Sequence, residues 1–180
     1  MRWLIKSRGR PEWALNLQMQ NAGLDPAKVS KVILSHSHED HTGTVGAFEN
    51  AQIVKEFAAQ KTTHYFLGDA WDLLGDQSIL IFKGGGHTKE DLMALVQLEK
   101  SVVLLTGDAV VHFSWLNSDD VERIPVNPER SAEVRNRIRW INKTQPEIVV
   151  IPGHDMCQIP SNRSDILIHN PASPDWKPED

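Results

Sequence analysis

Residues 35–43 read Ser-His-Ser-His-Glu-Asp-His-Thr-Gly and follow directly on the apolar run Val32-Ile33-Leu34. In an extended segment, residues two apart project to the same side, so His36 and His38 are expected to converge on one metal ion. Asp40 and His41 lie past the expected bend and face a second position. The stretch therefore predicts a metal site, with room for two ions, at the end of a strand.

Three later segments repeat this arrangement, in which an apolar run enters a loop that contains glycine and one potential ligand. The runs lie at 79–82, 102–105 and 148–151, and the ligands that follow them are His87, Asp108 and His154. Four strand ends thus provide seven candidate ligands. Imidazole and carboxylate groups are the ligand set that suits zinc, with iron or manganese as alternatives.

Each of these histidines has an ordinary alternative explanation, because loops rich in glycine and aspartate are common turns and a single loop histidine is usually exposed or hydrogen-bonded. That explanation is adequate for His87 or His154 taken alone. It fits the whole set poorly, because five of the eight histidines lie in these loops, each shortly after an apolar run. The joint pattern favours a metal site.

The order of these residues resembles the signature of the metallo-β-lactamase superfamily, which is His-x-His-x-Asp-His followed by a separate His, an Asp and a final His. All seven positions are matched, and the resemblance extends from about residue 21 to residue 155. It implies a pair of Zn²⁺ ions. The implied ligands are His36, His38 and His87 for one ion and Asp40, His41 and His154 for the other, with Asp108 as the bridge.

The resemblance also implies an α/β fold, a four-layered αββα sandwich of two mixed sheets flanked by helices. We expect residues 1–158 to form this domain and residues 159–180, which contain four prolines, to form an extended or loosely ordered tail. Only 35 residues precede His36, whereas the family has several strands before the motif. The first sheet is therefore expected to be incomplete, with an unpaired edge. The chain is then a truncated product, a natural short variant, or a homo-oligomer that completes its sheet through a second copy.

Helical periodicity marks three further stretches. We expect a helix at 12–22, another at 42–48 directly after the motif, and a third at 133–142 with a partly apolar face. A short capped turn is expected at 25–29, before the first metal-bearing strand.

Composition limits the class of protein and its partners. The 180 residues are 40% hydrophobic, which is enough for one sizeable core. No apolar run has the length of a membrane helix, and the start has too short an apolar stretch for a secretory signal, so we expect a cytoplasmic protein without a membrane partner. The net charge of -5 argues against nucleic-acid binding and favours a small-molecule substrate.

The single cysteine, Cys157, excludes an internal disulfide and a cysteine-based zinc finger. We expect it to be a small buried apolar residue. The alternative is that it approaches the metals, since it lies three residues after His154.

A pair of metal ions implies a hydrolase. Zinc lowers the pKa of bound water to about 7, so a metal-bound hydroxide is expected to attack an ester or lactone carbonyl that the other ion polarises. Asp40, besides acting as a ligand, is the candidate for taking up and returning the proton. The alternative function is that of a non-catalytic metal-binding remnant or interaction protein of the same fold.

Several residues narrow the branch of the superfamily. Asp108 stands where common metallo-β-lactamases have cysteine, and His38 stands where diiron oxygen-reducing relatives have glutamate. Glyoxalase II enzymes share the ligands but add a helical substrate domain after the last histidine, and the stretch that follows His154 here is expected to be too short for one. The stretch 107–113 looks similar to lactonase-like hydrolases, which often place a tyrosine after the bridging aspartate. His112 is the candidate to replace that tyrosine in substrate binding, and a histidine held by packing is the alternative.

Overall fold

Six strands form the main sheet of the chain in a computed structural model that describes residues 14–58, 62–118 and 125–155. The strands are β3 (Thr62–Tyr65), β4 (Gly68–Asp72), β5 (Ile79–Lys83), β6 (Leu92–Gln97), β7 (Val102–Leu105) and β8 (Ile148–Ile151). They lie in this order across the sheet; neighbours from β3 to β7 are antiparallel, and β8 is parallel to β7. The parallel pair needs a long crossover, which contains helix α3 (Pro128–Thr144).

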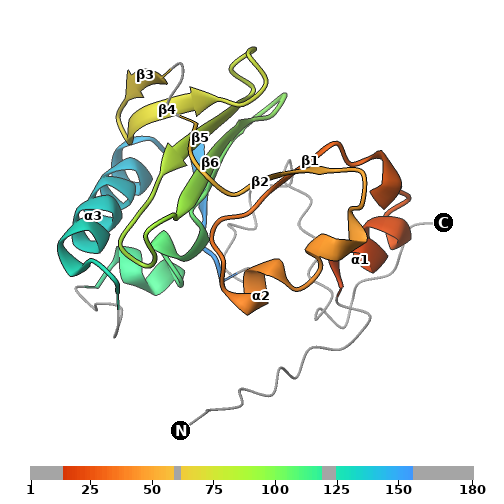
Figure 1. Cartoon of the computed structure of the whole chain (residues 1–180). Coiled ribbons are helices and arrows are strands. Elements are labelled where there is room, and N and C mark those ends of the chain that lie inside the picture. The colour runs from red at the N-terminus through yellow and green to blue at the C-terminus, as the bar shows by residue number, and fades with distance from the viewer. Residues whose placement is uncertain (1–13, 59–61, 119–124, 156–180) are drawn as a thin grey trace, which may run out of the picture.

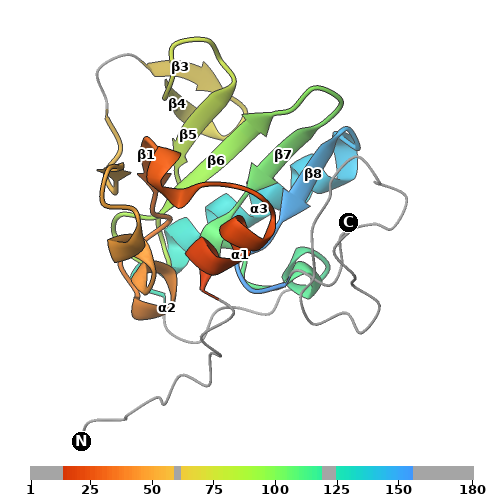
Figure 2. The ribbon, with the colours of Figure 1, turned by 90° about the vertical axis from the view of Figure 1, so that its right-hand side faces the viewer.

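A smaller sheet contains two parallel strands within the described ranges, β1 (Lys31–Ile33) and β2 (Gln52–Val54). The other helical elements are α1 (Leu15–Asn21), α2 (Glu39–Thr42) and the 3₁₀ turns η2 (Pro26–Lys28), η3 (Val45–Ala47), η4 (Gly107–Ala109) and η5 (Phe113–Leu116). Figures 1 and 2 show α3 against one face of the main sheet, and the small sheet with α1 and α2 on the other side. This arrangement confirms the predicted α/β sandwich.

Alternating side chains on the central strands explain these layers, because successive residues of a strand point to opposite faces. On β5, Leu80 and Phe82 are buried in a core that includes Ile138 of α3. The intervening Ile81 is buried in a second core, together with Val54 of β2. The main sheet is therefore apolar on both faces and packs between two layers.

Helix α3 is longer than the stretch 133–142 that the periodicity predicts. Asn127 caps it, since its side-chain oxygen accepts a hydrogen bond from the backbone N–H of Arg130 at 3.0 Å, and Pro128 occupies the first turn. These start signals lie upstream of the apolar face, so periodicity alone places the beginning of the helix too late.

The prediction of a single helix at 42–48 was wrong. A short helix, α2, begins inside the metal motif, and the separate turn η3 follows it. Gly43 and Gly46 lie between and within these two elements, and glycine is a poor helix former. The capped turn expected at 25–29 is confirmed as η2.

Other expectations fall partly or wholly outside the described residues. Helix α1 covers the later part of the predicted helix at 12–22, and residues before 14 are not described. Cys157 and the predicted tail at 159–180 lie wholly outside the described residues. Within the part of the chain that the structure describes, no helix is long and apolar enough to cross a membrane.

The loop between β5 and β6 packs tightly against the start of α3. The backbone N–H of Asn127 donates a hydrogen bond to the carbonyl of Gly86 at 3.0 Å. Gly86 has a φ of 116°, and a Cβ at this position would lie 2.5 Å from the backbone N and Cα of Ser131. Only glycine fits this conformation and this space, directly before His87.

We expect Gly86→Ala to lower the free energy of unfolding by more than about 2 kcal/mol, because the overpacking adds to the backbone strain. Chemical denaturation measures this loss. Gly75→Ala is the matched control, since Gly75 also has a positive φ, 83°, but an added Cβ would have nothing within 4 Å. Equal losses in the two variants would contradict the packing argument.

A second stability prediction concerns the core beneath α3. Ile138 is 0% exposed, so Ile138→Ala should lower the free energy of unfolding by about 2–5 kcal/mol through lost burial and a residual cavity. Lys143, exposed on the same helix, provides the comparison, and Lys143→Ala should change the value by less than about 0.5 kcal/mol. Similar denaturation midpoints for the two variants would refute this assignment of the core.

Candidate metal centre

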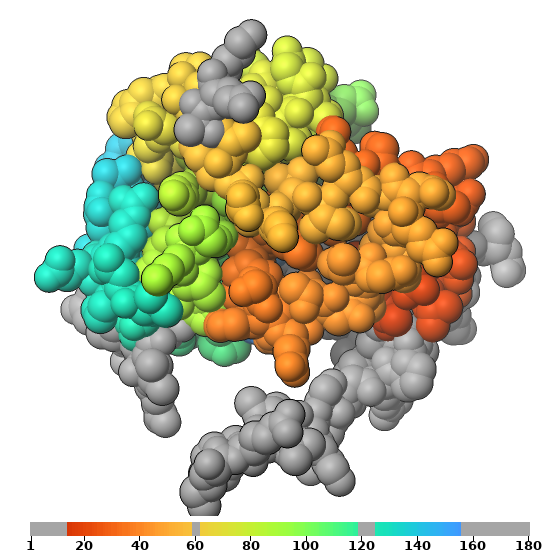
Figure 3. All heavy atoms as spheres, viewed as in Figure 1, coloured from red at the N-terminus to blue at the C-terminus, as the bar shows by residue number. Residues whose placement is uncertain are grey.

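The seven candidate ligands lie in loops and short helices that follow four strands. His36 and His38 follow β1, Asp40 and His41 lie on α2, His87 follows β5, Asp108 lies on η4 after β7, and His154 follows β8. In Figure 3 the orange residues near position 40 lie directly against the yellow-green residues near position 87. The two sheets thus bring distant parts of the chain to one edge.

The first group consists of His36, His38 and His87. One ring nitrogen of each lies within 4.8 Å of those of the other two. The Nδ1 atom of His38 and the Nε2 atom of His87 are 3.0 Å apart. The ring centroid of His36 lies 4.5 Å from that of His38 and 4.7 Å from that of His87, edge to face in both cases. These are the residues that the family resemblance implies for one ion.

The second group consists of Asp40, His41 and His154, and its ligand atoms also lie within 4.8 Å of one another. The Nε2 atoms of His41 and His154 are 3.2 Å apart. The Oδ2 atom of Asp40 lies 3.7 Å from the first and 3.5 Å from the second. This group matches the set implied for the other ion.

Asp108 lies between the two groups. Its Oδ2 atom is 3.5 Å from His87 Nε2 and 3.3 Å from His154 Nε2, and its Oδ1 atom is 3.3 Å from His41 Nε2. The Nε2 atom of His36 is 4.0 Å from Oδ2. One carboxylate therefore faces histidines of both groups, as a bridging ligand would.

The spacing of these atoms fits a divalent cation. Tetrahedral zinc with bonds of about 2.0–2.2 Å separates neighbouring ligand atoms by about 3.3 Å. Within the second group the three separations are 3.2, 3.5 and 3.7 Å. Among the described residues, His36 Nε2 and Asp108 Oδ1 are also buried without a hydrogen-bond partner. Buried polar atoms normally have a partner, so these two atoms are consistent with a ligand position.

Burial differs strongly across the cluster. The His36 and Asp108 side chains are 1% and 7% exposed, whereas those of His154 and Asp40 are 38% and 60% exposed. The cluster therefore has a closed inner side and an open outer side. The outer side is accessible to a small molecule from solvent.

Burial also sets the charge state of His36. The pKa of His36 is lowered from 6.5 to about 4, mainly by desolvation and next by the neighbouring His41. The carboxylate of Asp108 acts in the opposite direction, while His87 and His38 add to the lowering. The imidazole is thus neutral at pH 7, the form that donates a lone pair to a metal.

Two supporting features hold the ligand loops in place. Asp91, buried, accepts hydrogen bonds from the backbone N–H and the hydroxyl of Thr88, which closes the loop that carries His87. A Cβ on Gly153 would lie within 2.3 Å of Asp108 Oδ1, so glycine is required beside this carboxylate. Neither role was predicted from the sequence. The signal for Asp91 is its position directly before a strand, where an acidic residue often closes a turn.

His112, the candidate for substrate binding, is exposed at the start of η5, so the structure does not support a core histidine there. Its ring centroid lies 6.2 Å from that of Trp115. The preceding residue, Val111, accepts a hydrogen bond from the backbone N–H of His154 at 3.0 Å. His112 therefore lies next to a residue that is hydrogen-bonded to the loop that carries His154.

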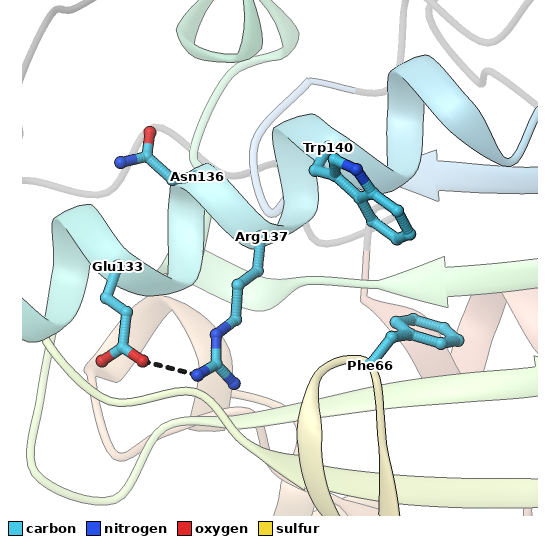
Figure 4. Close-up of a pocket in the computed structure, with 5 residues that line it drawn as sticks. All are labelled: Phe66, Glu133, Asn136, Arg137 and Trp140. Atoms are coloured by element: carbon cyan, nitrogen blue, oxygen red, sulfur yellow. Dashed lines mark hydrogen bonds and ion pairs between the residues drawn. The ribbon is translucent and has the colours of Figure 1, made fainter.

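Two cavities differ in their relation to the cluster. A pocket of about 400 Å³ is formed on α3 by Phe66, Glu133, Asn136, Arg137 and Trp140 and contains none of the candidate ligands. Figure 4 shows its two aromatic rings beside the ion pair of Glu133 and Arg137. A second cavity, of about 290 Å³, borders the cluster at His41 and Gly153 and is lined mainly by apolar side chains of β1, β6, β7 and β8. Of these two cavities, only the second adjoins the candidate ligands.

Comparison with known proteins adds independent findings. A model of the metallo-beta-lactamase superfamily matches residues 7–92. Metallo-beta-lactamase domain-containing protein 1 of Xenopus laevis is 28% identical over 142 residues, which cover 76% of this chain and 58% of that protein. The N-acyl homoserine lactonase AttM of Azorhizobium caulinodans is 27% identical over 172 residues, with 80% and 65% covered. The solved structure of AidC, a dizinc quorum-quenching lactonase in complex with a product, has a TM-score of 0.59 at 13% identity and covers 78% of this chain and 62% of AidC.

The chain spans less than two thirds of the length of the curated relatives described here. At its low identity, the likeness to AidC shows the fold alone. The family model includes the motif at 36–41 and the loop of His87, and the fold and the gathering of the seven side chains agree with it. These findings place the similarity of this chain in the metallo-β-lactamase superfamily, whose family model matches residues 7–92.

Proposed function

We propose that this protein is a dinuclear, metal-dependent hydrolase that opens a small lactone or ester. The observation that carries the proposal is the convergence of two ligand groups on one buried carboxylate, Asp108. The similarity to N-acyl homoserine lactonases supports a lactone as the substrate class. Zinc is the proposed metal, in keeping with the imidazole-rich ligand set.

In this proposal, His36, His38 and His87 would hold one ion and Asp40, His41 and His154 would hold the other, with Asp108 available as a ligand to both. When bound, the ions would supply a water molecule of lowered pKa and an electrophile for the substrate carbonyl. Asp108, at 7% exposure, is shielded from solvent and keeps the two groups at a fixed separation. The neutral His36 anchors the inner side.

Asp40 is the proposed proton carrier. Hydrolysis adds water across the C–O bond of the lactone, so the proton taken from water has to return to the alcohol oxygen that leaves. The Asp40 carboxylate is 60% exposed at the open side of the cluster, where a substrate can approach it. His112, also exposed, is proposed to donate a hydrogen bond to the substrate.

The test combines metal content with turnover. We expect purified protein to contain two zinc ions per chain by mass spectrometry and to hydrolyse members of a panel of N-acyl homoserine lactones, other lactones and aryl esters. Turnover should stop with a chelator and return with Zn²⁺. His38→Ala and Asp108→Asn should reduce turnover to the uncatalysed rate, because each removes a proposed ligand.

His64→Ala is the matched control for these variants, because His64 is exposed on β3 and lies outside the ligand groups. It should retain the wild-type rate. A protein with two metals but no turnover would favour the non-catalytic metal-binding alternative. Less than one metal per chain would contradict the metal centre itself.

The lowered pKa of His36 predicts a pH dependence of stability in the metal-free protein. Between about pH 6.5 and pH 4, the unfolded chain binds a proton at this site that the folded chain does not. The free energy of unfolding therefore falls as the pH is lowered through this window. Thermal unfolding in chelator at a series of pH values should show a smaller decline for His36→Gln than for wild type, and an unchanged decline for His64→Gln. An identical decline in His36→Gln and wild type would show that His36 is not the source of the pH dependence.

A further inference from the structure

We propose that the hydroxyl of Ser35 orients two histidines, one from each ligand group, and thereby couples the two metal positions. The inference rests on the proposed metal centre and concerns a positioning residue, not a ligand. Ser35 is partly buried and directly precedes His36.

The contacts of Ser35 reach both groups. Its Oγ atom lies 3.2 Å from His36 Nδ1 and 3.1 Å from His41 Nδ1. Both rings face Asp108 through their other nitrogen, Nε2. One hydroxyl thus contacts the Nδ1 side of two histidines, and the Nε2 atoms of these histidines belong to different ligand groups.

The chemistry of a hydroxyl decides what this contact does. A serine oxygen has two lone pairs and one proton, so it can accept a hydrogen bond from an Nδ1–H group of each ring. In that arrangement both Nε2 atoms keep a free lone pair for a metal. If the hydroxyl instead donated to one Nδ1, that neutral ring would carry its proton on Nε2, inside the cluster, where it would block metal binding. Only the double-acceptor arrangement suits both groups.

Ser35 is itself held from two sides. Its carbonyl oxygen accepts a hydrogen bond from the backbone N–H of Leu92 at 2.7 Å, which ties it to β6. On the other side, a Cβ on Gly107 would lie 2.7 Å from the Cβ of Ser35, so the loop that carries Asp108 packs directly against it. The hydroxyl therefore has a defined position relative to both the main sheet and the bridging carboxylate.

Two measurements on Ser35→Ala test the proposal. Competition with a chromophoric chelator gives the zinc affinity of each position, and ¹⁵N NMR of labelled histidines gives the tautomers in the metal-free protein. We expect both zinc dissociation constants to rise by about 10- to 100-fold. We also expect His36 and His41 to lose the Nδ1–H tautomer that both hold in wild type.

Ser35→Thr retains the hydroxyl and should restore both readouts. Ser37→Ala removes an exposed hydroxyl two residues away and should bind zinc with wild-type affinity. Wild-type affinities in Ser35→Ala, or a loss confined to one zinc position, would overturn the coupling. If Ser35→Ala does not fold, the wild-type tautomers decide, because an Nε2–H proton on either ring contradicts the proposal. A wild-type protein that binds no zinc would instead overturn the proposed function.

Discussion

The buried carboxylate of Asp108 is the constraint on which the rest of the site depends. A carboxylate in a protein interior is unfavourable unless charged or hydrogen-bonding partners compensate for its lost hydration. Here the neighbours are histidines from three separate loops, at 3.3–4.0 Å. The close approach of Gly153 leaves no space for the carboxylate to move away. The loops after β1, β5, β7 and β8 therefore have to meet at one point, and the order of strands in the two sheets satisfies that requirement.

The strand ends that carry the candidate ligands could be predicted from local signals, whereas the αββα fold and the division of the ligands into two groups came from the resemblance to a family. An apolar run followed by a loop histidine or aspartate identifies the ends of β1, β5, β7 and β8, and glycine precedes the ligand in the last three. Other elements carry weaker signals. Strand β3 is mostly exposed, and β6 begins with five consecutive apolar residues, which give no period of two. The break between α2 and η3 depends on glycines inside a stretch that otherwise resembles a helix.

The supporting residues were harder to predict than the ligands, for a physical reason. Asp91, Gly153 and Ser35 are residue types that occur in any loop. Gly153 acts across the fold, on Asp108, whereas Asp91 and Ser35 contact residues close to them in the sequence through side-chain geometry that spacing does not predict. Gly86 is similar to Gly153, because its requirement arises from the backbone of Ser131, 45 positions later in the sequence. Spacing along the chain therefore identifies the candidate ligands, whereas the residues that support them are identified from the side-chain contacts of the folded chain.

The uneven burial of the cluster has a consequence for metal exchange. The proposed position formed by Asp40, His41 and His154 has two ligands that are exposed to solvent, while the position that includes His36 is anchored in the interior. In the proposed dinuclear centre, an ion at the outer position would leave after local movement of two surface side chains, whereas the inner ion would have to detach from a buried imidazole. The two positions would then differ in residence time, and a protein with one ion in the inner position would be the intermediate of both loading and loss.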